Sequence, residues 1–321
     1  MVTEDYPKDA TAFGKAFSDE GACLRYLINV RWPEGFVCPV CGSGAYWLLK
    51  TGLMECRGCG KQVSPTSGTL LHGTRKSIGE WFRAMWWIAT QTTGGSARGL
   101  QRQLEFGSYQ TAWAWHHKLK RGMVRNGRDP LQGPVEIDEA FIGGKEQGVY
   151  GRETDKKSRV VVAVEITSPS RPVNGRIRLR QVTDCSSASL IPFVEENVTA
   201  GSVVITDGWS GYRPLKAKGF VHEIRVSKAK KKTDEDLLPN AHQTISLLKR
   251  WLLGTHHGAV SEKHLQFYLD EYTFRHNRRK SIHVGKIFYR LVQGVCEASP
   301  TPYWKLVGRT APDQPLHVVV T

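Results

Sequence analysis

Residues 135–144 read VEIDEAFIGG, and residues 203–212 read VVITDGWSGY. Both stretches are short and rich in Val and Ile, which predicts two strands, over 135–142 and 203–206. Asp207 closes the second strand, whereas Asp138 lies within the first, on the face opposite to Ile137, because side chains alternate along a strand. If the strands are neighbours, the two carboxylates converge and suit Mg2+, as used in two-metal phosphoryl transfer. The alternative is that each aspartate only caps a turn.

The chain around these stretches alternates strands with helices. Further strands are predicted over 160–166, 177–182 and near 223–226, a helix over 187–197, and a long helix over 242–253. From Pro134 onward the sequence therefore predicts an α/β domain with a mixed sheet.

A helical region precedes the α/β part. An apolar helix is predicted from Ile78 to the break at Thr92, followed by helices over 96–104 and 108–124 with a turn at 106–108. This spacing indicates a helix-turn-helix, whose second helix reads DNA. The candidate DNA contacts on or near that second helix are Gln110, Thr111, His116, His117, Lys118 and Lys120. The tryptophans between them, Trp113 and Trp115, are more typical of core positions.

Four cysteines form the sharpest local motif. The segments CPVCG, 38–42, and CRGCG, 56–60, are separated so that fourteen residues lie between the two C-x2-C pairs. Four thiolates from Cys38, Cys41, Cys56 and Cys59 complete a tetrahedral, closed zinc shell, which predicts a structural rather than a catalytic ion. The alternative is four free core cysteines. The remaining three, Cys23, Cys185 and Cys296, are expected to be small core residues.

Length and charge limit the class of protein. With 321 residues the chain exceeds the usual size of one domain, so two or three units are expected. The 45 Lys and Arg against 30 Asp and Glu give a net charge of +15, which is typical of proteins that bind polyanions, although a membrane surface would also attract it. The N-terminus has no apolar signal, and no run reaches the length of a membrane span. We therefore expect a soluble, cytoplasmic protein without a membrane partner.

Basic residues cluster in three runs that flank the two aspartates. The first run follows the strand of Asp138 as a hairpin, the second precedes the long helix, and the third lies near residue 280. Their members are Lys145, Arg152, Lys156, Lys157 and Arg159; Lys228, Lys230, Lys231 and Lys232; and Arg275, Arg278, Arg279 and Lys280. Each run alone is typical of a solvated face, but together they predict a path for DNA phosphates.

The long helix adds His242 and Lys249, which are seven positions and two helical turns apart and so share one face. With this helix the sequence resembles the bacterial insertion-sequence transposases that join a zinc ribbon and a helix-turn-helix to an RNase H-like DDE catalytic domain. The segments that carry the resemblance are FVCPVCG, 36–42; IDEAFIGG, 137–144; TDGWSGY, 206–212; SLLKRWL, 246–252, followed by GTH, 254–256; and YLDEYTFR, 268–275.

The resemblance implies a fold and a domain order. It implies an α/β chain with an RNase H-like domain over 132–285, in which helices flank a mixed sheet. A short helix and zinc ribbon over 1–70, an all-α helix-turn-helix over 75–128, and a C-terminal helix and tail over 286–321 complete the expected organisation.

The resemblance also implies the catalytic residues. Asp138, Asp207 and His242 would form the site and hold Mg2+ or Mn2+, expected as two ions. Lys249 would face substrate phosphate, and Arg250 would contact DNA. His242 stands where a DDE triad has glutamate, in a branch that carries histidine or asparagine there. The alternative is a capping or packing histidine, with Asp234, Glu235, Asp236 and Glu271 as fallback ligands.

The expected function is that of a transposase that binds the terminal inverted repeats of its element, cuts DNA and joins the released end to target DNA, by a cut-and-paste or a copying route. The implied partner is double-stranded DNA, held by a homo-oligomer associated with the bacterial nucleoid. Two alternatives stay open: a structure-directed nuclease on the same fold, and a zinc-ribbon regulator with a degenerate catalytic domain.

Overall fold

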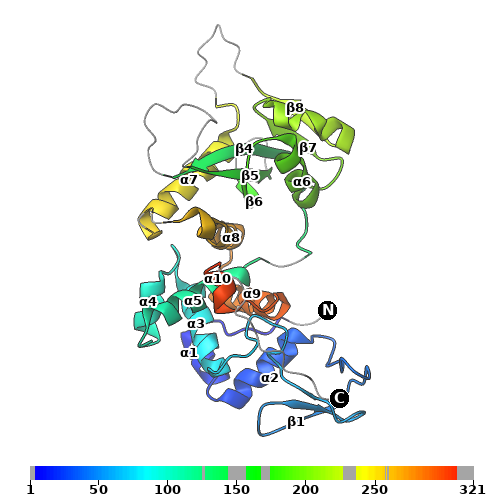
Figure 1. Ribbon diagram of the computed structural model, residues 1–321, viewed down its shortest axis with the longest axis vertical. Helices are drawn as coiled ribbons and strands as arrows, with labels where there is room; N and C mark the ends of the chain where they lie inside the picture. The colour runs from blue at the N-terminus through cyan, green and yellow to red at the C-terminus, as the bar shows by residue number, and fades with distance from the viewer. Residues whose placement is uncertain are drawn as a thin grey trace. The chain divides into compact units, whose positions relative to one another are not determined.

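The computed structural model describes residues 4–124, 127–143, 157–167, 174–226, 236–256, 258 and 260–308, and the chain forms two compact units (Figure 1). The first unit comprises Met1–Asn126 with Ser281–Thr321, and the second comprises Gly127–Lys280. Each unit has its own apolar core. None of the helices in the described part of the chain is both long and apolar enough to cross a membrane.

The first unit begins with two helices and the ribbon. The helices are α1 (Ala10–Ala16) and α2 (Glu20–Arg31), and the ribbon is an antiparallel sheet of β1 (Tyr46–Leu48), β2 (Met54–Cys56) and β3 (Gln62–Val63). Ile28 of α2 shares a buried cluster with Phe36 and Met54, so the ribbon packs on this helix. The predicted helix before the cysteines is thereby confirmed.

Helices make up the rest of the first unit. They are α3 (Ile78–Thr90), α4 (Ala97–Gln103), α5 (Tyr109–Arg121), α9 (Val284–Glu297) and α10 (Tyr303–Leu306). The indole rings of Trp81 on α3 and Trp115 on α5 stack at 3.5 Å, which confirms Trp115 as a core residue. Phe288 on α9 packs edge-on against Phe82 on α3 with ring centroids 5.4 Å apart. The expected C-terminal helix therefore belongs to the first unit.

The second unit is built on a five-stranded mixed sheet. Its strands are β4 (Val135–Ile142), β5 (Ser158–Ile166), β6 (Asn174–Val182), β7 (Val203–Thr206) and β8 (Val221–Ile224), in the order β6-β5-β4-β7-β8. β5 runs antiparallel to both β4 and β6, whereas β7 is parallel to both β4 and β8. β4 and β7 have the predicted bounds and are neighbours, as the site hypothesis requires.

Helices cover both faces of this sheet (Figure 1). On one face α6 (Ser187–Asn197) and the 3-10 helix η1 (Ser210–Lys218) pack on Val135 and Ile137; on the other, α7 (Pro239–His256) and α8 (Glu262–Arg278) pack on Ala140. The mixed sheet with flanking helices is thus confirmed. The turn expected after Asp207 continues as η1, in which Tyr212 and Leu215 are buried.

Candidate functional site

The four cysteines of the ribbon form one cluster. Their sulfur atoms all lie within 4.8 Å of one another, with 3.7 Å between Cys38 and Cys59 and 3.5 Å between Cys41 and Cys56. Four sulfurs at about 2.3 Å from one tetrahedral Zn2+ are about 3.8 Å apart, so the spacing fits zinc. Among the residues that the structure describes, this is the one group of three or more Cys, His, Asp or Glu with so close a spacing.

Backbone turns aim these sulfurs inward. Gly42 and Gly60 follow the two cysteine pairs with φ of +73° and +68°, a left-handed conformation that glycine adopts without strain. Each donates its N–H to the carbonyl oxygen of the first cysteine of its pair, at 3.0 Å to Cys38 and 2.9 Å to Cys56. Burial opposes ionisation of Cys56, but the amides of Cys59 and Gly58 and the neighbouring thiols outweigh it and lower its pKa to about 6.

The two aspartates lie on adjacent strands. Glu136 of β4 pairs with Ile205 of β7, and continuing this parallel register by two residues places Asp138 opposite Asp207. Asp138 accepts the N–H of Glu139 at 2.8 Å, and Asp207 accepts the N–H of Trp209 at 2.9 Å. One oxygen of Asp207 therefore caps a turn, which agrees with the alternative interpretation that this aspartate is a turn cap. The parallel register also places Asp207 opposite Asp138.

His242, on the first turn of α7, lies between two carboxylates. Its Nε2 is 3.3 Å from Oδ2 of Asp138, and its Nδ1 is 2.5 Å from Oδ1 of Asp236. Neighbouring donors around an octahedral ion at about 2.1 Å are about 3.0 Å apart, so Asp138 and His242 fit one ion. A histidine that binds metal through one nitrogen usually donates the other N–H to a carboxylate, which is the arrangement with Asp236.

Glu136 fixes α7 in this position, and sequence reasoning missed it. Its side chain is 1% exposed and accepts the N–H of Asn240 at 2.8 Å, the N–H of Ala241 at 2.9 Å and the side-chain amide of Asn240 at 2.9 Å. A carboxylate at a helix N-terminus satisfies unpaired N–H groups and opposes the positive end of the helix dipole. The one available signal was that Glu136 lies two residues before Asp138, on the same strand face.

Glu139 links β4 to the chain that follows Asp207. Tyr212 of η1 donates its hydroxyl to Oε1 of Glu139 in a short hydrogen bond, and both side chains are buried. Burial, and next the charge of Glu139, raise the pKa of Tyr212 well above its ordinary value, which keeps the hydroxyl a donor. Glu136 and Asp138 of β4 thus contact α7, and Glu139 contacts η1, so this strand is connected to both elements.

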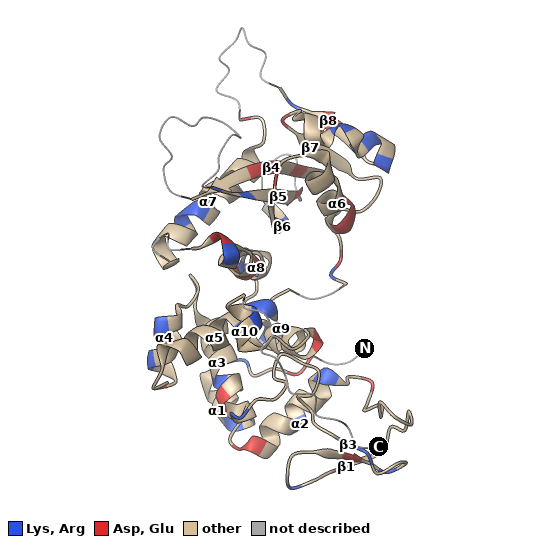
Figure 2. Ribbon diagram, in the orientation of Figure 1, with Lys and Arg blue, Asp and Glu red and all other residues tan. Residues whose placement is uncertain are grey.

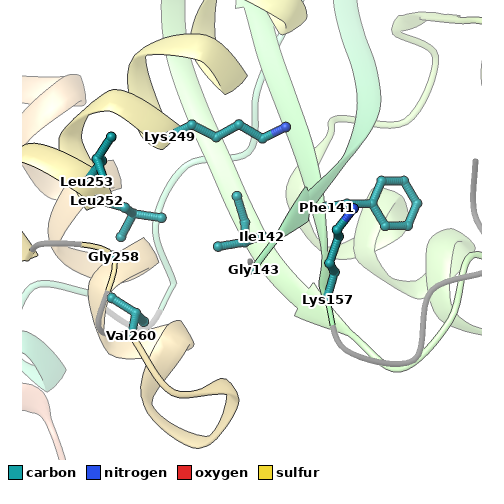
Figure 3. Close-up of a pocket in the computed structure, with 9 residues that line it drawn as sticks. All are labelled: Phe141, Ile142, Gly143, Lys157, Lys249, Leu252, Leu253, Gly258 and Val260. Carbon is teal, nitrogen blue, oxygen red and sulfur yellow. The ribbon is translucent and has the colours of Figure 1, made fainter. Parts of the chain in front are cut away.

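Lys249 and Arg250 are exposed on α7, and Lys249 lines a pocket of about 440 Å3 with Lys157 and the end of β4 (Figure 3). Figure 2 shows Lys and Arg residues, coloured blue on the ribbon, along α7 and α4. Lys145, Arg152, Lys156, Lys228, Lys230, Lys231 and Lys232 lie outside the described residues, as do the fallback ligands Asp234 and Glu235.

The third basic run makes local contacts. Arg275 pairs with Glu271 at 2.9 Å, and the guanidinium of Arg278 lies 4.0 Å from the ring centroid of Phe274. Arg279 is exposed and donates to the carbonyl of His276 at 2.7 Å. Glu271 is fully buried and paired with Arg275, so it is engaged within α8 rather than with the aspartates. Only Arg279 of these three arginines is largely exposed.

The predicted DNA contacts on α5 differ in exposure. Gln110 is exposed and Thr111 and Lys118 are half-buried. His116, His117 and Lys120 are at most 2% exposed in this structure, which corrects their expected role as open DNA contacts because a groove contact needs an accessible side chain. Two exposed arginines on α4, Arg98 and Arg102, were missed although their spacing of four places them on one helix face.

Models of two known protein domains match this chain, one in each unit. Residues 18–62 match the transposase zinc-ribbon domain, and residues 130–277 match the ISXO2-like transposase domain. The chain is also 26% identical over 288 residues to an uncharacterized protein in transposable element ISH50 of Halobacterium salinarum, covering 81% of this chain and 92% of that protein. The resemblance drawn from the motifs is confirmed.

We expect the wild-type chain to carry one zinc ion and Cys56→Ser to lose it, because three thiolates no longer close the shell. Metal content of the purified proteins, measured by mass spectrometry, checks this. Cys23→Ala is the matched control, since Cys23 is buried outside the cluster and should leave one ion bound. Equal zinc in both variants would contradict the assignment.

We expect Glu136→Gln to loosen the start of α7. Loss of a charged acceptor for two N–H groups should cost about 1–3 kcal/mol locally and raise amide hydrogen exchange at Asn240 and Ala241 by about 5- to 150-fold. Mass spectrometry of peptides spanning residues 239–245 measures it. Glu195→Gln on α6, an exposed glutamate that pairs with Lys218, is the control and should leave this exchange unchanged; a similar rate in all three proteins would remove Glu136 from this role.

Proposed function

Because the chain belongs to the insertion-sequence transposases that join a zinc ribbon to an ISXO2-like transposase domain, we propose that it binds the inverted repeats of its own element and catalyses metal-dependent strand cleavage and strand transfer. The observation that carries the proposal is the approach of His242 Nε2 to Asp138 Oδ2, at 3.3 Å, beside the strand that ends in Asp207. The three residues come from β4, from the chain that follows β7 and from α7.

The donor set suits a phosphodiester reaction. Asp138, Asp207 and His242 would hold Mg2+ or Mn2+. When bound, such ions lower the pKa of water and stabilise charge on the phosphate. Asp236 would keep the Nδ1 proton of His242 directed away from Asp138, so that Nε2 presents its lone pair. Glu136 would hold α7, and with it His242, against β4.

Basic residues of both units would bind DNA in different ways. Lys249 and Arg250, with Lys157, would contact phosphates near the catalytic centre, and Arg279 would contact phosphates farther away, beside β6; such contacts add affinity without sequence preference. Gln110 and Thr111, in the first turn of α5, would contact base edges, since recognition helices use their N-terminal residues. Arg98 and Arg102 extend the basic surface of α4. We propose a homo-oligomer as the active form, because two element ends must be joined together.

The test uses full-length protein, a duplex that carries the element end, a target plasmid, and Mg2+ or Mn2+. We expect the wild type to cut at the element end and to join that end to the plasmid. Asp138→Asn and Asp207→Asn should each lower both rates on the order of a thousandfold, while gel-shift affinity stays within about twofold, because the ligands act on chemistry rather than on docking. Asp129→Asn, at an exposed aspartate, is the control.

The outcomes separate the alternatives. Cutting that persists in Asp138→Asn or Asp207→Asn would contradict the catalytic assignment. Cutting without joining would instead indicate a nuclease. Tight binding of the element end with no metal-dependent cutting by the wild type would indicate a regulator with a degenerate domain.

A further inference from the structure

A pocket of about 440 Å3 opens at the end of β4, within the second unit (Figure 3). Its lining residues come from the end of β4 and the residue after it, the residue before β5, the second half of α7 and the chain before α8. They are Phe141, Ile142, Gly143, Lys157, Lys249, Leu252, Leu253, Gly258 and Val260. The volume falls within the range of about 300–1,000 Å3 that is typical of ligand sites.

The lining combines an apolar wall with two cations. Figure 3 shows the side chains of Ile142, Leu252 and Val260 around one hollow, with the Lys249 side chain extended above them toward the strands. Leu253 is 67% exposed at the rim, although a leucine of this size is usually more covered in a helix beside a core. An apolar hollow with ammonium groups at its edge complements a ligand that has a flat apolar part and a phosphate.

The pocket lies close to the candidate catalytic residues. Lys249 is seven residues beyond His242 on α7, or roughly 10 Å along the helix axis. Ile142 is four residues beyond Asp138 on the same face of β4, or about 13 Å along the strand. Stacked nucleotides rise about 3.4 Å each, so the pocket is reached from the scissile phosphate within roughly three or four nucleotides.

We propose that this pocket takes the base of one nucleotide near the scissile phosphate, turned out of the DNA stack, with Lys249 and Lys157 at its phosphates. A base inside a duplex cannot enter a side pocket, so it must leave its stack and its partner, and burial against Ile142, Leu252 and Val260 would offset the free energy lost on unpairing. The inference rests on the proposed function and adds to it a specific nucleotide subsite. It would hold the strand in register while the neighbouring phosphate reacts.

The experiment compares two charge-matched variants on α7. Leu253→Glu places a carboxylate at the pocket rim, whereas Leu247→Glu places one on the same helix at a residue that is 37% exposed and does not line the pocket. Full-length proteins bind element-end duplexes in which 2-aminopurine replaces one base at each of the four positions on either side of the cleavage site. Fluorescence of 2-aminopurine rises when the base leaves the stack.

We expect fluorescence to rise at one position with the wild type and Leu247→Glu, and not with Leu253→Glu. Cleavage by Leu253→Glu should fall about tenfold relative to Leu247→Glu on the intact duplex. On a duplex with an abasic site at that position the two variants should cleave alike, because no base is left to place. A variant that merely misfolds would stay slower on both duplexes.

Two results would overturn the proposal. If the wild type cuts the duplex but fluorescence rises at no flanking position, or rises equally with Leu253→Glu, the pocket does not hold a base while the proposed function stands. If the wild type neither binds nor cuts the element end, the proposed function fails, and the subsite fails with it.

Discussion

The candidate catalytic centre depends on the contacts that the three acidic side chains of β4 make, namely Glu136, Asp138 and Glu139. A buried carboxylate is unfavourable unless hydrogen bonds or opposite charges compensate for the lost water. Glu136 meets this condition at the N-terminus of α7, and Glu139 meets it through the hydroxyl of Tyr212 on η1. Asp138, between them, has a side chain that is 14% exposed and approaches Nε2 of His242. The hydrogen bonds that compensate for the burial of Glu136 and Glu139 thus also position the helix that bears His242 and the segment that follows Asp207.

The features that could be predicted from the sequence are those that depend on local residue patterns. The bounds of β4, β7 and α6 follow from short apolar runs and from helical spacing, and the four cysteines with their glycines define the ribbon because all donors lie within 22 residues of one another. The contact of Glu136 with Asn240 could not be predicted in this way. It joins residues 104 positions apart, and neither residue type has a preferred partner until the sheet and α7 are folded together. The burial of His116 and His117 was missed for the same reason, since helical spacing alone does not show which face is covered.

The zinc-ribbon cluster and the proposed catalytic centre differ in what holds their side chains. In the ribbon, backbone turns within each cysteine pair direct the sulfurs, so the site is largely a local structure that an ion would complete. In the α/β unit the proposed ligands come from β4, the chain that follows β7 and α7, and their approach would depend on the register of β4 with β7 and on the Glu136 cap. Asp236, considered only as a substitute ligand in the sequence, instead contacts Nδ1 of His242. That contact gives the histidine a defined orientation toward Asp138, which a packing histidine would not need.

The catalytic proposal requires Asp138, Asp207 and His242 to bind one metal centre. Anomalous scattering from crystals of the full-length chain grown with Mn2+ tests this most directly, because the ion is located without reference to activity. We expect Mn2+ within about 2.0–2.5 Å of carboxylate oxygens of Asp138 and Asp207 and of Nε2 of His242, with Asp236 still bonded to Nδ1. Manganese bound elsewhere, with none in reach of both Asp138 and Asp207, would contradict this assignment.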